Sequence, residues 1–245
     1  MSMSNKPSTD KNTFRQGILD GIPIALGYLS VSFSFGILAV TSGLTLWQAV
    51  LVSLFNLTSA GQVAGLSIMT ASGGLIEMAV SQLIINLRYG LMSISLSQKT
   101  DKTVTVPARF FLAYGITDEI FGVAAGVDHP IGRRYHLGLM LLPIAGWTLG
   151  TFIGAALGAV FPEFLSNALA IGIYGMFVSI VVPKTKHNRG ILICVLIAVS
   201  ISALFYFEPH LSSVISGGFA TIIAAIIAAA VGAAFFPKDK EEDAA

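Results

Sequence analysis

The stretch Thr117-Asp118-Glu119 decides how this chain folds, because it places two acids inside the long apolar run Ala108–Val127. A second stretch, Asn86-Leu87-Arg88-Tyr89, places a cation in another such run. An ionisable side chain at membrane depth costs roughly 2.5–3.5 kcal/mol on insertion scales, so it usually faces a protein interior or a wet cavity and has a partner. The two stretches therefore favour a transport pathway in which Arg88 meets one of the acids.

The composition is typical of a membrane protein. Hydrophobic residues make up 54% of the 245 residues and charged residues 11%, against roughly 25% charged residues in soluble domains, and the mean hydropathy is +0.80. Every Lys and Arg except Arg88 lies in a tail, in a polar connection or at the edge of an apolar run. No cluster of bases interleaved with aromatic residues is present, so we expect no nucleic-acid partner.

Eight apolar segments predict an all-α fold, a polytopic membrane helical bundle in the lipid bilayer. Most are close to the about 20 residues that a spanning helix needs, and short connections with Gly or Pro separate them. We expect residues 1–237 to form a single transmembrane domain and residues 238–245 a disordered charged tail. The segments are Ile18–Val40, Leu46–Met69, Leu75–Leu96, Ala108–Val127, Leu137–Phe161, Asn167–Val182, Ile191–Phe207 and Val214–Phe236.

The positions of Lys and Arg set the expected orientation, because short cytoplasmic loops carry an excess of these residues. With eight spans, both termini and the loops with Arg133 and Lys184 are cytoplasmic, and the loops with Glu163 and Glu208 are external. The basic connection at residues 99–109 is then external, against the rule. A seven-span alternative with a re-entrant second segment repairs this connection but exports the Arg133 and Lys184 loops.

The second segment contains a polar, small-residue stretch, Asn56–Gly65, in the middle of a span. Ser59 and Gly61 fit close helix packing, which small residues allow. They also fit a discontinuous helix, because transporters use the free backbone groups at such breaks to hold substrate. Gln62 is a bulky polar side chain among small ones and favours the discontinuous helix, with the break expected at Ala60–Gly65.

Helical periodicity separates the two acids of the fourth segment. Tyr114 and Asp118 are one turn apart, whereas Glu119 points about 100° away from Asp118. The acids therefore have different neighbours. A structural interpretation has one acid neutralise Arg88 and the other pair near a helix end. Two adjacent acids, where one would neutralise Arg88, favour a functional interpretation.

Motifs of other functions are missing from the sequence. The chain has no Gly-x-Ser-x-Gly or His-Glu-x-x-His motif, so we do not expect an enzyme, and it has no ATP-binding motif of the Gly-x-x-x-x-Gly-Lys type. The four histidines lack the i, i+4 pairing of a helical zinc site, and Cys194 is the one cysteine. We expect no metal and no cofactor, and transport that is passive, ion-coupled or powered by another protein.

Five blocks of sequence carry a resemblance to a known family. In order and spacing they resemble the AzlC/YgaZ family over residues about 14–236, and the block Gly-x-Thr-Asp-Glu-x-Phe is the most specific. The resemblance implies the large subunit of a bacterial branched-chain amino acid exporter, which works in the inner membrane with a small AzlD/YgaH-type membrane protein. The blocks are Ile22-Pro23-Ile24, Phe33-Ser34-Phe35-Gly36, Ala60-Gly61-Gln62, Asn86-Leu87-Arg88 and the run from Tyr114 to Phe121.

Two positions depart from the pattern of that family. Gly61-Gln62-Val63 stands where the family usually has Ser-Gln-Phe, and Tyr89 stands where it commonly has His after the Arg. The second change removes a group that titrates near neutral pH. It argues against a proton route through Tyr89 and leaves the preferred substrate open.

The leading functional hypothesis is an exporter of valine, leucine, isoleucine and their analogues. A zwitterion needs a cation and an anion beside an apolar pocket, so Arg88 would take the carboxylate and Asp118 or Glu119 the ammonium. The same two acids are the candidates for proton coupling, as in an antiporter. Asn86, Gln62, Gly61, Ser59 and Phe35 complete the expected substrate site. The alternatives are a channel-like or structural membrane subunit, for which a symmetric ring of charge is expected, and then an intramembrane enzyme.

Overall fold

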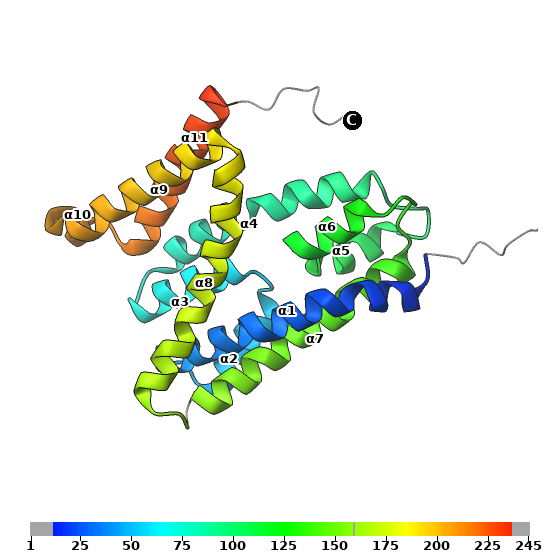
Figure 1. Cartoon of the computed structure of the whole chain (residues 1–245), viewed down its shortest axis with the longest axis horizontal. Coiled ribbons are helices and arrows are strands. Elements are labelled where there is room, and N and C mark those ends of the chain that lie inside the picture. Colours follow the sequence, from blue (N-terminus) through cyan, green and yellow to red (C-terminus); the bar gives the residue numbers. More distant parts are fainter. Residues whose placement is uncertain (1–11, 159, 237–245) are drawn as a thin grey trace, which may run out of the picture. The chain divides into compact units, whose positions relative to one another are not determined.

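The computed structural model describes residues 12–158 and 160–236 of the chain, and helices account for most of them (Figure 1). The long helices are α1 (Phe14–Thr41), α4 (Leu75–Ser97), α7 (Arg133–Gly158), α8 (Glu163–His187), α9 (Arg189–Phe207) and α11 (Gly217–Phe235). The short helices are α2 (Leu46–Phe55), α3 (Ser59–Thr70), α5 (Val106–Tyr114), α6 (Asp118–Gly126) and α10 (Pro209–Val214).

The fold is an all-α polytopic membrane bundle, as the sequence predicts. Each of the eight apolar segments is helical, and the second is discontinuous, divided into α2 and α3. Within the described residues, α1, α7, α9 and α11 are long and apolar enough to cross a membrane. Two further helices, α4 and α8, have 23 and 25 residues, which correspond to about 34 Å or more at 1.5 Å per residue.

Packing divides the chain into two compact units. The first unit contains Met1–Gln62 and Asn86–Ala170, and the second contains Val63–Ile85 and Ile171–Ala245. The predicted single domain stays a prediction, and the predicted tail lies outside the described residues.

The scaffold of the first unit is the pair α1 and α7, which lie side by side (Figure 1). Their backbones approach closely because glycines face the partner helix. A Cβ added at Gly21 would lie 2.7 Å from the Leu139 carbonyl oxygen, and one added at Gly146 would lie 2.6 Å from that of Ala25. Side chains at these glycines would push the helices apart.

Helices α5 and α6 form a hairpin whose two ends lie at the same end of the first unit. Lys99, two residues beyond α4, donates hydrogen bonds to the carbonyl oxygens of Ala125 and Val127, and so holds the C-terminus of α6. The start of α5 follows only seven residues after Lys99 along the chain. Each of the two helices has nine residues, or about 13 Å, which is less than half of a 30 Å hydrocarbon core. Neither helix alone is therefore long enough to cross that core.

The chain also reverses direction between α2 and α3. The Gln62 amide in the first turn of α3 donates to the carbonyl oxygens of Asn56 (2.7 Å) and Val52 (3.4 Å) in the last turns of α2. A continuous helix would separate residues 52 and 62 by about 15 Å, beyond the reach of a Gln side chain. The start of α3 therefore folds back against the end of α2.

Three connections meet at one end of the first unit. The Asn12 side chain, just before α1, donates to Asp101 (3.1 Å) and accepts from the Gly132 backbone N–H (2.7 Å). Thr100 and Ile131 form an isolated parallel bridge beside them. We call this end the Asn12 end; it gathers the start of α1, the α4–α5 connection and the start of α7.

These contacts correct three expectations. The break in the second segment lies at residues 56–58 and not at Ala60–Gly65, because the backbone N–H of Gln62 already donates to Thr58 and starts α3 there. The fourth segment is not one helix but is interrupted at residues 115–117. The basic connection at residues 99–109 lies at the same end of the first unit as the start of α1, whereas the eight-span expectation put them at opposite ends.

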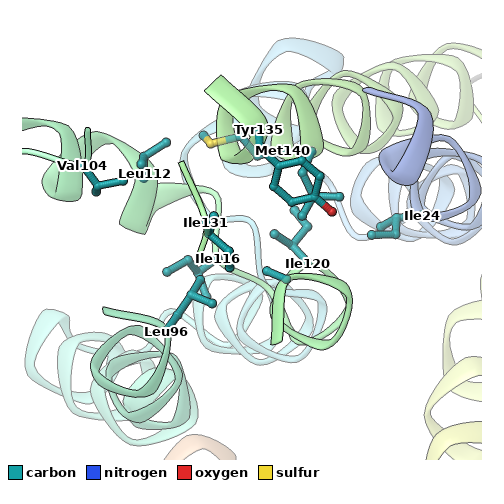
Figure 2. Close-up of a cluster of buried hydrophobic side chains, with 11 residues drawn as sticks. Ile24, Leu96, Val104, Leu112, Ile116, Ile120, Ile131, Tyr135 and Met140 are labelled. Atoms are coloured by element: carbon teal, nitrogen blue, oxygen red, sulfur yellow. The ribbon is translucent and has the colours of Figure 1, made fainter. Parts of the chain in front are cut away.

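The hydrophobic core of the first unit fixes the α5–α6 hairpin in place. Ile116 at the turn and Ile120 on α6 are buried with Tyr135 and Met140 of α7 (Figure 2). Ile24 of α1 and Leu96 of α4 belong to the same cluster. Burial of one such side chain contributes about 1.5–3 kcal/mol, and these contacts position the turn of the hairpin.

In the second unit, α9 packs against α11 and α10. Glu77 in the first turn of α4 is buried and accepts a hydrogen bond from Ser216, the N-cap of α11. The Glu77 carboxylate therefore lies at the N-terminus of α11, where the positive end of the helix dipole stabilises an anion.

Candidate functional site

After each of the two interruptions, a threonine caps the helix that follows. Thr117 caps α6, because its hydroxyl accepts from the backbone N–H of Ile120 (3.4 Å). Thr58 accepts from the backbone N–H of Gly61 (3.4 Å) and so caps α3. Each break thus presents the positive end of a short helix within the first unit, a geometry that favours nearby negative charge.

A direct contact joins the two breaks. The hydroxyl of Tyr114, the last residue of α5, donates to the backbone carbonyl of Leu54 in the last turn of α2. Carbonyls in the last turn of a helix have no intrahelical partner, so Tyr114 satisfies one that the break leaves open. The breaks at residues 56–58 and 115–117 therefore form one site.

An ion pair lies at this site. Arg88 of α4 and Asp118, the first residue of α6, approach to 2.8 Å between Nη1 and Oδ2. Their side chains are 44% and 39% exposed, so the protein does not enclose the pair. Arg88 also donates to the hydroxyl of Tyr89 (3.0 Å) and lies over its ring.

Glu119 has a different neighbour, as the sequence predicts for the two acids. The Tyr28 hydroxyl of α1 hydrogen-bonds to Glu119 and lies 2.6 Å from Thr117 Oγ1. A hydroxyl has one proton, so Tyr28 donates to one of these oxygens at a time. We call Tyr28, Arg88, Tyr89, Asp118 and Glu119 the polar cluster.

Gln62 brings an unsatisfied acceptor beside the first break. Its side chain is fully buried, and its Nε2 is held by the carbonyls of Val52 and Asn56 and by Ser53 Oγ (3.3 Å). These two carbonyls fix the orientation of the amide, because they can only accept. The Oε1 atom has no hydrogen-bond partner within the described residues, so it is a positioned acceptor for a donor group.

The other predicted site residues lie on three different helices, α1, α3 and α4. Ser59 and Gly61 are in the first turn of α3. Asn86 is two residues before Arg88 in α4, which turns it about 160° away from that side chain. Phe35 is fully buried on α1, two turns beyond Tyr28 and on the same face of the helix.

Two members of the polar cluster were not predicted as site residues. Tyr28 and Tyr89 carry phenol hydroxyls inside apolar runs, and that position was the available signal. One helical relationship was wrong. Tyr114 and Asp118 do not share a helix face, because the break at residues 115–117 separates them, and Tyr114 contacts Leu54 instead.

The fold and the site define an all-α polytopic membrane protein with two interrupted segments that meet at a charged cluster. The chain belongs to the AzlC family: the family model described as AzlC protein matches residues 23–161. This match contains α1 to α7 from Pro23 onward, including both breaks and the polar cluster.

Curated relatives carry membrane-protein names. An "Uncharacterized membrane protein" of Archaeoglobus fulgidus is 31% identical over 183 residues, covering 72% of this chain and 79% of the relative. "Inner membrane protein YgaZ" of Escherichia coli is 22% identical over 214 residues, covering 84% and 87%. An "Uncharacterized membrane protein" of Helicobacter pylori is 25% identical over 205 residues, covering 81% and 88%. No solved structure matches the chain.

Proposed function

We propose that the protein is a secondary transporter subunit that exports valine, leucine, isoleucine and analogues across the bacterial cytoplasmic membrane. The observation that carries the proposal is the half-exposed ion pair of Arg88 and Asp118 where the two breaks meet. It puts opposite charges side by side in an apolar protein, and a zwitterionic amino acid with an aliphatic side chain is complementary to that arrangement. Membership of the AzlC family agrees with this proposal.

The substrate would bind by exchanging partners with the ion pair. Its carboxylate would bind the guanidinium of Arg88, whose planar set of donors suits a carboxylate. Its ammonium would take Asp118, and the free Oε1 of Gln62 supplies a further acceptor near the first break. Each charge of the site then keeps a partner throughout, so the exchange avoids the cost of an unpaired charge away from water.

Proton coupling is the proposed driving force, with Glu119 as the candidate carrier. Glu119 contacts Tyr28 and Thr117 is beside it, whereas Asp118 is engaged with Arg88. This division leaves Glu119 available for a proton while Asp118 holds substrate. Purified protein in vesicles should move substrate faster with an imposed pH gradient than without one. Equal rates would refute coupling while leaving the transport proposal intact.

We propose that α2–α3 and α5–α6 are both re-entrant and that both termini lie in the cytoplasm. The Asn12 end gathers Arg15, Lys99, Lys102, Arg109 and Arg133, which makes it the cytoplasmic end by the positive-inside rule. If α8, α9 and α11 each cross once after α7, the loop at residues 184–189 and the C-terminal lysines return to the cytoplasm, and Glu163 and Glu208 face outward. No basic connection then breaks the rule.

A small AzlD/YgaH-type membrane protein is the proposed partner, and the protein itself is proposed to have no enzymatic activity. The partner is proposed from the resemblance to branched-chain amino acid exporters. The experiment that tests the proposed function therefore compares cells with and without this partner.

The test is efflux of preloaded valine, leucine, isoleucine and methionine from cells that carry this chain, with and without the small partner. We expect branched-chain amino acids to leave faster only when both proteins are present. If no amino acid leaves the cells faster either with or without the partner, the proposed function is refuted.

A further inference from the structure

A separate cavity of about 220 Å³ lies in the first unit between the end of α4, α5 and the start of α7. Its lining includes Thr100 and Val104 near the Asn12 end and Ile116 in the second break. None of its lining residues belongs to the polar cluster. They are Ser93, Ile94, Leu96, Ser97, Thr100, Val104, Arg109, Leu112, Ala113, Ile116 and His136.

His136 is the feature of this cavity that requires a ligand or water. Its side chain is only 2% exposed, and neither ring nitrogen has a hydrogen-bond partner within the described residues. Buried polar side chains nearly always have partners, and leaving one unsatisfied costs about 1–3 kcal/mol. Whatever fills the cavity therefore gains free energy by hydrogen-bonding to His136.

The charge of the lining favours an anion. Arg109 of α5 is the charged lining residue, and no Asp or Glu lines this cavity. An ammonium group would have no anionic partner here, and an unpaired charge away from water is costly. A carboxylate would meet the Arg109 guanidinium and an N–H of His136.

The hydroxyls of the lining are acceptors. Ser93 donates its proton to the Tyr89 carbonyl (2.7 Å), Ser97 to that of Ile94 (2.7 Å) and Thr100 to that of Ser97 (2.9 Å). Their oxygens retain lone pairs toward the cavity. They can receive a neutral donor such as water, and they do not add charge.

The remaining wall is aliphatic. Leu96, Val104, Leu112 and Ile116 line the cavity and belong to the hydrophobic cluster (Figure 2). The volume corresponds to about seven water molecules at roughly 30 Å³ each. A branched aliphatic chain with one carboxylate fits this size and this combination of walls.

We propose that this cavity is a second ligand site, which binds a small branched aliphatic carboxylate through Arg109 and His136 and does not require an ammonium group. The site lies on the cytoplasmic side of the second break if the Asn12 end is cytoplasmic. Its existence does not depend on the proposed export activity, because binding is measurable without transport.

The test is isothermal titration calorimetry on the purified full chain in detergent micelles. The probes are 4-methyl-2-oxopentanoate, which has the carboxylate alone, leucine, which has both groups, and isopentylamine, which has the amine alone. We expect the oxo acid to bind at least as tightly as leucine and the amine not to bind. Binding of the amine, or no binding of the oxo acid, would overturn the proposal.

Variants locate the binding. His136→Phe and Arg109→Leu should each weaken binding of the oxo acid about tenfold or more, the effect of a lost hydrogen bond to a charged group. Ala113→Leu should block the cavity, and His136→Gln serves if the Phe variant does not fold. Arg133→Leu is the matched control, because Arg133 is an exposed cation outside the cavity. Equal affinity in the His136, Arg109 and Ala113 variants would overturn the proposal.

Two further arms separate this site from the alternatives. Arg88→Leu removes the carboxylate-binding residue of the polar cluster, so binding of the oxo acid that remains in this variant and is lost when Arg109→Leu is added belongs to the cavity. Loss of all binding in Arg88→Leu alone would place the ligand at the polar cluster instead and overturn the proposal. Phosphatidylglycerol added to the micelles should not compete. Competition by this lipid would show that the cavity holds a lipid headgroup, which would overturn the proposal.

Discussion

The hydroxyl of Tyr114 at the end of α5 hydrogen-bonds to the backbone carbonyl of Leu54 at the end of α2. The two residues are 60 positions apart in the sequence; Tyr114 directly precedes one break, and Leu54 lies in the last turn before the other. This contact joins two helix interruptions, which are far apart in the sequence, into one site.

Tyr114→Phe should weaken this junction while leaving the apolar ring in place. The Leu54 carbonyl loses its partner, so we expect the free energy of unfolding to fall by about 1–3 kcal/mol. Thermal unfolding in detergent and valine efflux should both decline. Tyr174→Phe is a matched control, and an equal loss in both variants would contradict a specific role for Tyr114.

Asp118→Asn should impair transport far more than stability. The Arg88–Asp118 pair is about 40% exposed on both sides, so loss of Asp118 does not leave Arg88 enclosed by protein, and the loss of stability should be smaller than for a fully buried pair. Membrane abundance should therefore stay near that of the parent protein while valine efflux falls at least tenfold. A parallel fall of abundance and efflux would mean that the pair is chiefly structural.

Glu119→Gln should separate coupling from binding. The amide keeps the shape of the side chain and can still accept a hydrogen bond from Tyr28, so we expect normal abundance. Efflux should lose its acceleration by a pH gradient. Asp128→Asn, an exposed acid outside the polar cluster, is the control, and a gradient response that persists in Glu119→Gln would exclude this residue as the proton carrier.

Cysteine labelling tests the two re-entrant segments. In a Cys194→Ala background, Lys102→Cys and Arg134→Cys should react with an impermeant maleimide only in inside-out vesicles. Gly74→Cys, at the opposite end of α4, should react only from outside; a side chain there meets nothing within 4 Å. Labelling of Lys102→Cys from outside would restore a fourth segment that crosses the membrane.

The Asn12 end should weaken in acid through Asp101. Hydrogen bonds from Thr103 hold the pKa of Asp101 below its usual value of 3.8. A folded-state pKa below that of the unfolded chain gives stability that is present above about pH 4 and is lost as the pH falls through the folded pKa. Thermal unfolding at several pH values should show a deficit of Asp101→Asn relative to the parent protein near pH 7. The deficit should vanish in strong acid, and one that is constant with pH would contradict this account.

Much of the fold follows from the sequence, because an apolar run of about 20 residues has few alternatives in a bilayer. The positions of Arg88, Asp118 and Gln62 in such apolar runs predicted that these polar side chains belong to a functional site. The residues that they contact could not be predicted from the sequence. A break of three residues leaves hydrophobicity nearly unchanged, so Gly115-Ile116-Thr117 reads as part of a continuous helix, and the helical face assigned to Tyr114 and Asp118 was wrong for that reason.

The basic connection at residues 99–109 was the sequence feature that pointed to the proposed arrangement. With one re-entrant segment, this connection is cytoplasmic but the later basic loops become external, against the positive-inside rule. With two re-entrant segments, all the basic connections are cytoplasmic. The second could not be inferred from hydropathy, since α5 and α6 together have the length of one span. Lys99 and its contacts with Ala125 and Val127 are needed to see it.

Valine counterflow in vesicles tests the central claim, that the Arg88–Asp118 pair between the two breaks is the substrate site. Vesicles that contain this chain with the proposed small partner are loaded with unlabelled valine and diluted into labelled valine. We predict saturable accumulation for the parent protein, none for Arg88→Leu, and partial activity for Arg88→Lys, because a point charge cannot reproduce a bidentate carboxylate contact. Arg133→Leu should behave as the parent. Accumulation by Arg88→Leu equal to that of the parent protein would contradict the account.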